Sequence, residues 1–232
     1  MKIQLRLIVS VLTLLPSTLC MSQTAETQRA SKPHHTIVPL PQEGLTHERM
    51  VKLLERGFEI LSGDPDKAGA PFVIRIYNLE NQIVVPHWHP EDEHLTIVKG
   101  TWSIGDGETF DRTALREMSA GDYVLVPKTM RHFGWAKTEV ITQIHGIGPF
   151  KVIPVDPWIL LADPNDPGPF KTDPNAASRF KYRLKDRVRS SRGEGVVLFG
   201  FSSEKNRITQ YAVKRDDGSA FAEFEEELTK VR

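Results

Sequence analysis

Cysteine is nearly absent from this chain of 232 residues, because Cys20 is the only one, and an internal disulfide is therefore excluded. An excess of charge of either sign is also lacking: 30 Lys and Arg balance 30 Asp and Glu, for a formal net charge of zero. This balance gives no electrostatic reason to expect nucleic acid or an acidic membrane as a partner. The apolar stretch at residues 7–15 is too short to cross a bilayer. Hydrophobic residues make up 39% of the chain, an ordinary globular share.

The first 22 residues have the pattern of a secretory signal. Basic residues precede the apolar stretch, and candidate cleavage sites follow it. Lipidation of Cys20 is disfavoured because Leu19 is bulky where a lipoprotein signal prefers a small side chain. We therefore expect a periplasmic or secreted protein whose mature form has no cysteine, which excludes a thiol nucleophile.

The rest of the chain divides by composition. A polar lead at 23–44 precedes a region of short alternating β patterns and Gly or Pro turns at 45–153, which opens with an expected helix at 47–56. A proline-rich linker follows at 154–178. Seven prolines lie between residues 149 and 174, which argues against regular helix or central strand there. We expect truncation after Lys171 to leave a soluble barrel.

Two histidines one residue apart, His87 and His89, precede Glu93 and Gly100 at fixed spacings. Residues two apart on a strand point to the same face, so both imidazoles and the carboxylate can reach one site. His94 has the opposite parity and should face away. Imidazole and carboxylate together suit Mn, Fe, Co, Ni, Cu or Zn.

A second stretch, from Gly121 through Pro127 to His132, reads as a turn, a short strand, a proline turn and the start of another strand. His132 would supply a fourth ligand. Three neutral imidazoles and one carboxylate leave a divalent ion with one or two open positions for water, O2 or substrate.

These two stretches resemble the paired motifs of the cupin superfamily, G-x5-H-x-H-x3-E-x6-G and G-x5-P-x-G-x2-H-x3-N. The chain departs from them at Asn81 and Thr129, which replace glycines of turns, and at Ala136, which replaces an asparagine. All four ligand types are present. The surrounding sequence is similar to secreted or periplasmic mono-cupins, and the match spans about a fifth of the chain.

The resemblance implies an all-β fold, a cupin (double-stranded β-helix or jelly-roll) barrel. It implies a divalent transition metal, which can be Fe, Mn, Zn, Ni or Cu, with the ligands His87, His89, Glu93 and His132. Small molecules are the expected substrates or ligands, without a membrane span, and a homodimer is compatible with the family.

Two functions stay open. One is a metal-dependent oxidoreductase, most simply a dioxygenase acting on a small organic molecule; the other is a non-catalytic metal- or ligand-binding cupin whose C-terminal part docks a partner. By strand parity, His145 is either a catalytic acid or base facing the metal or an outward residue. Trp88, Phe133 and Trp135 either line the pocket mouth or pack in the barrel, with Trp88 expected to face away from the metal.

Residues 179–232 have short strands and tight turns that resemble a small SH3-like or Tudor-like barrel, which is usually an interaction module. Residues 179–192 carry seven basic residues against one acidic residue. In an exported protein we expect this segment to be a solvated face or a contact with the cupin domain rather than a nucleic-acid site.

Overall fold

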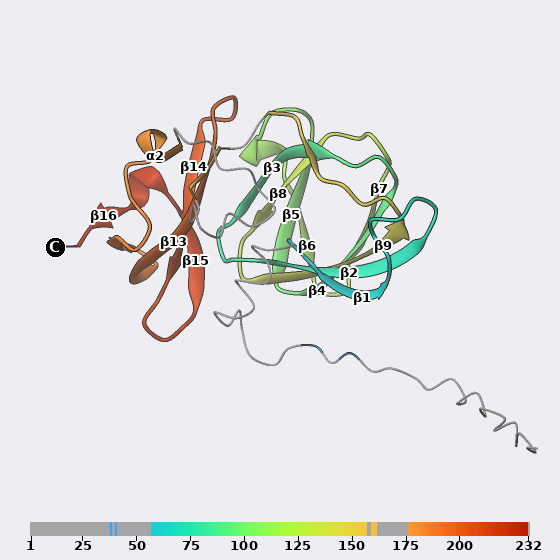
Figure 1. Ribbon diagram of the computed structural model, residues 1–232, viewed down its shortest axis with the longest axis horizontal. Coiled ribbons are helices and arrows are strands. Elements are labelled where there is room, and N and C mark those ends of the chain that lie inside the picture. Colours follow the sequence, from blue (N-terminus) through green and yellow to red (C-terminus); the bar gives the residue numbers. More distant parts are fainter. Residues whose placement is uncertain (1–37, 39, 41–56, 157–158, 162–175, 232) are drawn as a thin grey trace, which may run out of the picture. The chain divides into compact units, whose positions relative to one another are not determined.

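The computed structural model describes residues 38, 40, 57–156, 159–161 and 176–231 (Figure 1). The predicted signal segment and the helix expected at 47–56 lie outside these described residues, so export and that helix remain predictions. In the part of the chain that is described, no helix combines the length and the apolar character needed to cross a membrane. The described chain is almost entirely β.

The first sheet has five antiparallel strands in the order β1-β2-β9-β4-β7. They are β1 (Glu59–Gly63), β2 (Pro71–Asn78), β9 (Val140–Ile147), β4 (Glu93–Lys99) and β7 (Tyr123–Val126). The sequence of β4 shows why such strands form, because Glu93, Leu95 and Ile97 are buried while the residues between them are partly exposed. Alternation of this kind is typical of a strand with one face on a core.

The second sheet also has five antiparallel strands, in the order β10-β3-β8-β5-β6. They are β10 (Ile153–Pro154), β3 (Ile83–Trp88), β8 (His132–Ala136), β5 (Thr101–Asp106) and β6 (Arg116–Ser119). The chain crosses between the two sheets after β2, β3, β4, β6, β7, β8 and β9, as in a double-stranded β-helix. The all-β cupin fold predicted from the sequence is confirmed.

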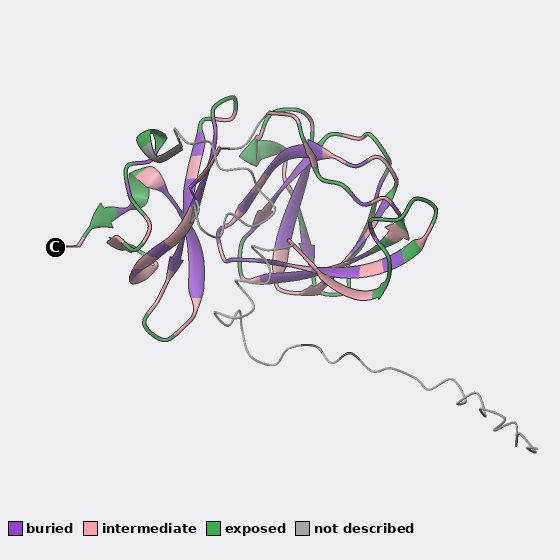
Figure 2. Cartoon of the chain, viewed as in Figure 1, coloured by how far each residue is buried: buried purple, intermediate pink, exposed green. Residues whose placement is uncertain are grey.

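The main core lies between the inward faces of the two sheets, where the strands are buried (Figure 2). Alternate residues of β2, β4 and β5 build much of it: Phe72, Ile74, Leu95, Ile97, Trp102 and Ile104. The core ends at a cavity on whose wall the predicted metal ligands lie.

The C-terminal part forms a third antiparallel sheet in the order β15-β14-β13-β12-β16, with β11 paired to β13. Its strands are β11 (Ile159–Leu161), β12 (Arg187–Ser190), β13 (Gly193–Ser203), β14 (Ile208–Lys214), β15 (Ala220–Phe224) and β16 (Thr229–Lys230), and the short helix α2 (Ala176–Arg179) precedes β12. Its SH3-like or Tudor-like character and the domain boundaries drawn from composition remain predictions.

The proline-rich stretch contains two short strands, β10 and β11. Pro154 lies in β10, at the edge of the second sheet, where a missing N–H interrupts no central ladder. Strand β11 adds to the C-terminal sheet through pairing of Leu160 with Phe201.

The C-terminal sheet packs against the two-sheet barrel within one compact unit, Val38–Arg232. One shared apolar cluster joins Ile83 and Val85 of β3 to Phe201, Ile208 and Phe224. A second joins residues of β2 and β9 to alanines of β14 and β15. Strand β3, which carries a predicted ligand, therefore has the barrel cavity on one side and the C-terminal sheet on the other.

Candidate metal centre

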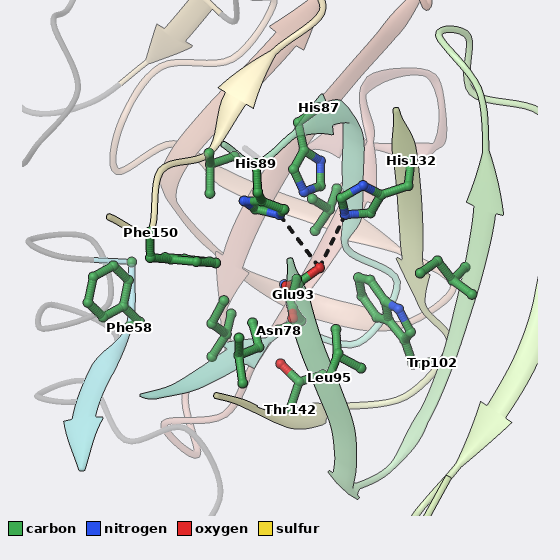
Figure 3. A pocket seen from close by; sticks show the side chains of 16 residues that line it. Phe58, Asn78, His87, His89, Glu93, Leu95, Trp102, His132, Thr142 and Phe150 are labelled. Atoms are coloured by element: carbon green, nitrogen blue, oxygen red, sulfur yellow. Dashed lines mark ion pairs between the residues drawn. The ribbon is translucent and has the colours of Figure 1, made fainter. Parts of the chain in front are cut away.

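Strands from both sheets bring the four predicted ligands to one place (Figure 3). His87 lies near the end of β3 and pairs directly with His132, the first residue of β8. His89 follows β3, and Glu93 begins β4. Two hydrogen bonds join the turns next to these strands: the N–H of Thr129 donates to the His89 carbonyl at 2.8 Å, and the N–H of Lys128 donates to Oδ1 of Asp92 at 2.7 Å.

The three imidazoles form a cluster that can hold a metal ion, since one ring nitrogen from each lies within 4.8 Å of the others. Oε2 of Glu93 lies 3.6 Å from Nε2 of His89 and 3.5 Å from Nε2 of His132. All four residues are buried, with 3–6% of their surface exposed. The structure therefore brings Glu93 into the same cluster as the histidines.

Backbone carbonyls select the tautomer of the three rings. Nδ1 of His87 lies 2.9 Å from the Val85 carbonyl, and Nδ1 of His89 lies 2.8 Å from the Lys151 carbonyl. Nδ1 of His132 lies 3.2 Å from the carbonyl of Met130. A carbonyl can only accept, so each Nδ1 carries the proton and donates it. In its neutral form, each ring therefore keeps the lone pair of Nε2 available, which is the arrangement of a metal-binding histidine.

Burial also keeps two of these rings neutral. The pKa of His87 lies well below its ordinary value because burial penalises the imidazolium, and the positive charges that His132 and His89 can carry lower it further. Burial lowers the pKa of His89 as well, and this outweighs the opposite effect of the Glu93 carboxylate. Neutral imidazoles are the form that binds metal.

Two buried atoms at the centre of the cluster suit a cation. Nε2 of His89 and Oε2 of Glu93 have no hydrogen-bond partner within the described ranges. Buried polar atoms are almost always paired, so such orphans require an explanation. A divalent ion would satisfy both, and the set of three nitrogens and one carboxylate suits the transition metals named above. The residues therefore fit the metal that the resemblance implies.

The ligands form one wall of a cavity of about 310 Å³ (Figure 3). Most of the remaining wall is apolar and includes Phe58, Phe150 and Trp102. Two neutral polar side chains, Asn78 of β2 and Thr142 of β9, also line the cavity. The volume is at the small end of the range for ligand pockets.

His145 lies elsewhere, so the expectation that it acts as an acid or base beside the metal is corrected. It is exposed on the outer face of the first sheet, opposite to the inward Ile144. Its ring stacks on that of His94, its cross-strand partner, with centroids 4.9 Å apart and planes at 17°. The cavity side of β9 carries Thr142 and Ile144, so the outward alternative for His145 is the one that the structure adopts.

The aromatic residues Trp88, Phe133 and Trp135 pack against other side chains and do not line the cavity. Trp88, as expected, faces away from the ligands, and the guanidinium of Arg131 lies 5.5 Å from its ring centroid. Phe133 is fully buried against Phe110, and Trp135 packs with the cluster shared with the C-terminal sheet.

Sequence reasoning missed the aromatic residues that do line the cavity. Trp102 and Ile104 alternate on β5, and this period-two pattern was available as a signal. Trp102 fits because Gly134, beside it on β8, has no Cβ: an added Cβ would lie 1.9 Å from Cζ2 of the indole. Phe58 and Phe150 come from segments outside both motifs, and no local pattern marks them.

No protein-family model and no curated protein sequence matches this chain. Solved structures do. An RmlC-like cupin protein from Desulfovibrio desulfuricans is 14% identical, with 50% of this chain and 98% of that chain covered and a TM-score of 0.37. A cupin-2 domain protein from Shewanella frigidimarina is 21% identical over 39% of this chain and 79% of that chain, with a TM-score of 0.32. A recombinant oxalate oxidase in complex with glycolate is 22% identical, with 37% of this chain and 46% of that chain covered and a TM-score of 0.32. Solved structures similar to this chain thus include cupins.

Proposed function

We propose that this protein is a metal-dependent oxidoreductase of the cupin superfamily, of dioxygenase type, acting on a small organic molecule. His87, His89, Glu93 and His132 hold one divalent transition ion, which can be Fe, Mn, Zn, Ni or Cu. One observation carries the proposal: three carbonyl-bound imidazoles and one carboxylate converge on the wall of an apolar cavity.

An ion held by these residues would supply a Lewis acid for O2 or a substrate oxygen. The chain's own residues do the rest. The backbone carbonyls hold the three rings in one tautomer and orientation. The apolar walls exclude water from the substrate and strengthen the electrostatic interactions within the cavity.

The second candidate is a non-catalytic metal- or ligand-binding cupin whose C-terminal sheet docks a partner. The position of His145 favours it, because the histidine expected to serve as acid or base lies on the outer face. In this candidate the ion and the cavity only hold a ligand.

Metal analysis of the purified full-length chain tests the site. We expect one equivalent of transition metal in the wild type and little in His89→Ala, together with a lower melting temperature in metal-containing buffer. His94→Ala is the matched control, since it removes a histidine from the outer face near the site. Equal metal in wild type and His89→Ala would contradict the site.

Oxygen uptake separates the two candidates. Protein loaded with Fe(II) under argon is mixed with air-saturated buffer and a panel of small organic compounds. Uptake that depends on a compound and is lost in His89→Ala supports the oxidoreductase. Metal and ligand binding without any uptake supports the non-catalytic candidate.

A further inference from the structure

The chemical character of the residues that line the cavity indicates what the cavity binds. Sixteen residues line it: the four ligands, ten apolar residues including Gly57, and the two neutral polar residues Asn78 and Thr142. The occupant therefore meets metal ligands on one side, the two neutral polar side chains at one place, and mainly apolar side chains elsewhere, among them Trp102, whose indole Nε1 has no hydrogen-bond partner among the described residues.

Charge limits the occupant. A divalent ion with three neutral imidazoles and the Glu93 carboxylate carries a net charge of +1, which one anionic oxygen neutralises. A second negative charge would be placed against apolar or neutral side chains, and burying an unpaired charge is costly. A neutral or singly ionised ligand fits this balance, and a dianion does not.

The aromatic walls favour a flat apolar body. The ring of Phe150 stacks on His89, with centroids 4.9 Å apart and planes at 18°, and packs edge-on against Phe58 at 5.8 Å. In Figure 3, Phe58 and Phe150 lie on one side of Glu93 and Trp102 lies on the other. Aromatic pairs add attraction beyond simple burial. The cavity volume of about 310 Å³ equals the share of roughly ten water molecules, which is room for about ten non-hydrogen atoms.

The polar pair lies away from the imidazoles. Figure 3 shows Asn78 and Thr142 on the side of Glu93 opposite to the three histidines. They come from the neighbouring strands β2 and β9, on which Ile76 pairs with Thr142. A molecule that reaches the ion with one oxygen can direct a second polar substituent toward this pair.

We propose that the cavity binds a small aromatic hydroxy compound of the phenol or catechol class. Its hydroxyl group faces the metal ligands, its ring lies between Phe150 and Trp102, and a neutral polar substituent on the ring meets Asn78 and Thr142. This assignment rests on the proposed function, because it uses the metal charge, and it makes Asn78 and Thr142 the residues that select among ring substituents.

Calorimetric titration of the full chain loaded with Zn(II), which undergoes no redox turnover, tests the assignment. Three probes are used: 4-ethylphenol, 4-(hydroxymethyl)phenol and oxalate. We expect both phenols to bind and oxalate to bind at least tenfold more weakly. Thr142→Val keeps the shape of the side chain and removes its hydroxyl. We expect this variant to bind 4-(hydroxymethyl)phenol about tenfold more weakly than the wild type and to bind 4-ethylphenol with nearly the same affinity. Asn78→Leu should act in the same direction.

The outcomes separate this inference from the proposed function. Metal-loaded protein that binds neither phenol, or that prefers oxalate, overturns the inference and leaves the metal site standing. Equal losses for both phenols in Thr142→Val and Asn78→Leu overturn the selecting role of the pair. If metal analysis finds no bound ion, the proposed function fails. The same titrations on metal-free protein then decide the inference. Phenol binding with the expected pattern in the variants supports it, and the absence of binding overturns it.

Discussion

The side chain of Gln210 is bonded to the backbone at the start of the strand that begins with Ile83. Its Oε1 accepts the N–H of Ile83 at 3.0 Å, and its Nε2 donates to the carbonyl of Asn81 at 2.9 Å. Gln210 belongs to β14 of the C-terminal sheet and is completely buried. Because Ile83 begins β3, the C-terminal sheet holds the strand that carries His87.

Replacing Gln210 with Ala should destabilise the whole unit. The change leaves the carbonyl of Asn81 and the N–H of Ile83 buried without their partner, and each such group costs about 1–3 kcal/mol of stability. We expect the free energy of unfolding to fall by about 3 kcal/mol in urea denaturation, and the metal affinity to fall with it. Gln143→Ala, on a half-buried position of β9, is the control and should change stability by about 0.5 kcal/mol or less. Equal effects of the two changes would contradict the role of Gln210.

Truncation after Lys171 tests the modular organisation predicted from composition. The shared apolar cluster places Ile83 and Val85 of β3 against Phe201, Ile208 and Phe224. Removing the C-terminal sheet exposes this side of β3, so we now expect the truncated chain to aggregate or to melt more than 10 °C below the full chain. Melting curves and metal content check this result. A soluble truncated form with full metal content would support the independent barrel instead.

The sequence predicted the barrel and the four clustered residues because motif spacing and strand parity are local signals. His87 and His89 need only a strand, and Glu93 and His132 follow from fixed offsets. The inward or outward direction of His145 depends on which face of β9 meets the core, and parity alone does not reveal this. The walls from Phe58 and Phe150, and the contact of Gln210 with β3, depend on long-range packing that no local pattern encodes.

Asn81 and Thr129 occupy positions that are glycine in the cupin motifs, and replacing each with glycine should change the stability in opposite directions. Asn81 and Thr129 both have left-handed backbone conformations, with φ of 66° and 64°. Thr129 is exposed and β-branched, so Thr129→Gly relieves strain, and we expect a gain of about 0.5–1 kcal/mol after the entropic cost of glycine.

Asn81→Gly has the same backbone effect but removes buried hydrogen bonds. The Asn81 amide accepts from Nε1 of Trp135 at 3.0 Å and donates to Glu223 and to the Ala222 carbonyl, each at 3.1 Å. We expect a loss of about 2–4 kcal/mol. Urea denaturation of both variants checks the pair, and a stabilised Asn81→Gly would show that these bonds contribute little.

Glu93→Gln should weaken the binding of Fe(II) and Mn(II) more than that of Cu(II) or Ni(II). The change keeps the size of the side chain but removes the only negative charge and the hard oxygen donor of the set. We expect at least a tenfold loss for Fe(II) in metal titrations. Glu91→Gln and Asp92→Asn are the controls, since the Asp92 carboxylate accepts the N–H of Lys128. A larger loss in Glu91→Gln would identify that residue as the carboxylate ligand.

Glu227 should make folding stability depend on pH near neutrality. Its pKa is raised to about 7, first by the hydrogen bond that it shares with Glu223 and then by burial and repulsion. The folded chain therefore holds a proton that the unfolded chain releases above its ordinary pKa of 4.5. Stability from this group is present at low pH and decreases as pH rises toward 7.

Glu227→Gln should remove this dependence, because the amide donates to Glu223 at every pH. We expect the variant to melt about 1–2 °C above the wild type at pH 8 and close to it at pH 5; the gain is small because solvent screens an exposed carboxyl. Glu226→Gln, at the exposed neighbouring position, should keep most of the wild-type slope. If the melting temperatures of wild type and Glu227→Gln change by the same amount between pH 5 and 8, Glu227 is not the source of the pH dependence.

The pairing of His87 with His132 has a consequence for the order of folding events. These partners, like the strands β2 and β9, are distant in sequence, so their contacts form only after a large loop has closed. Proteins dominated by such contacts fold slowly. We therefore expect the ligand set to be completed late in folding, after the hairpins of local strands have formed. In a stopped-flow refolding experiment, the rate of metal capture would follow the slowest phase of barrel closure rather than the early formation of β structure.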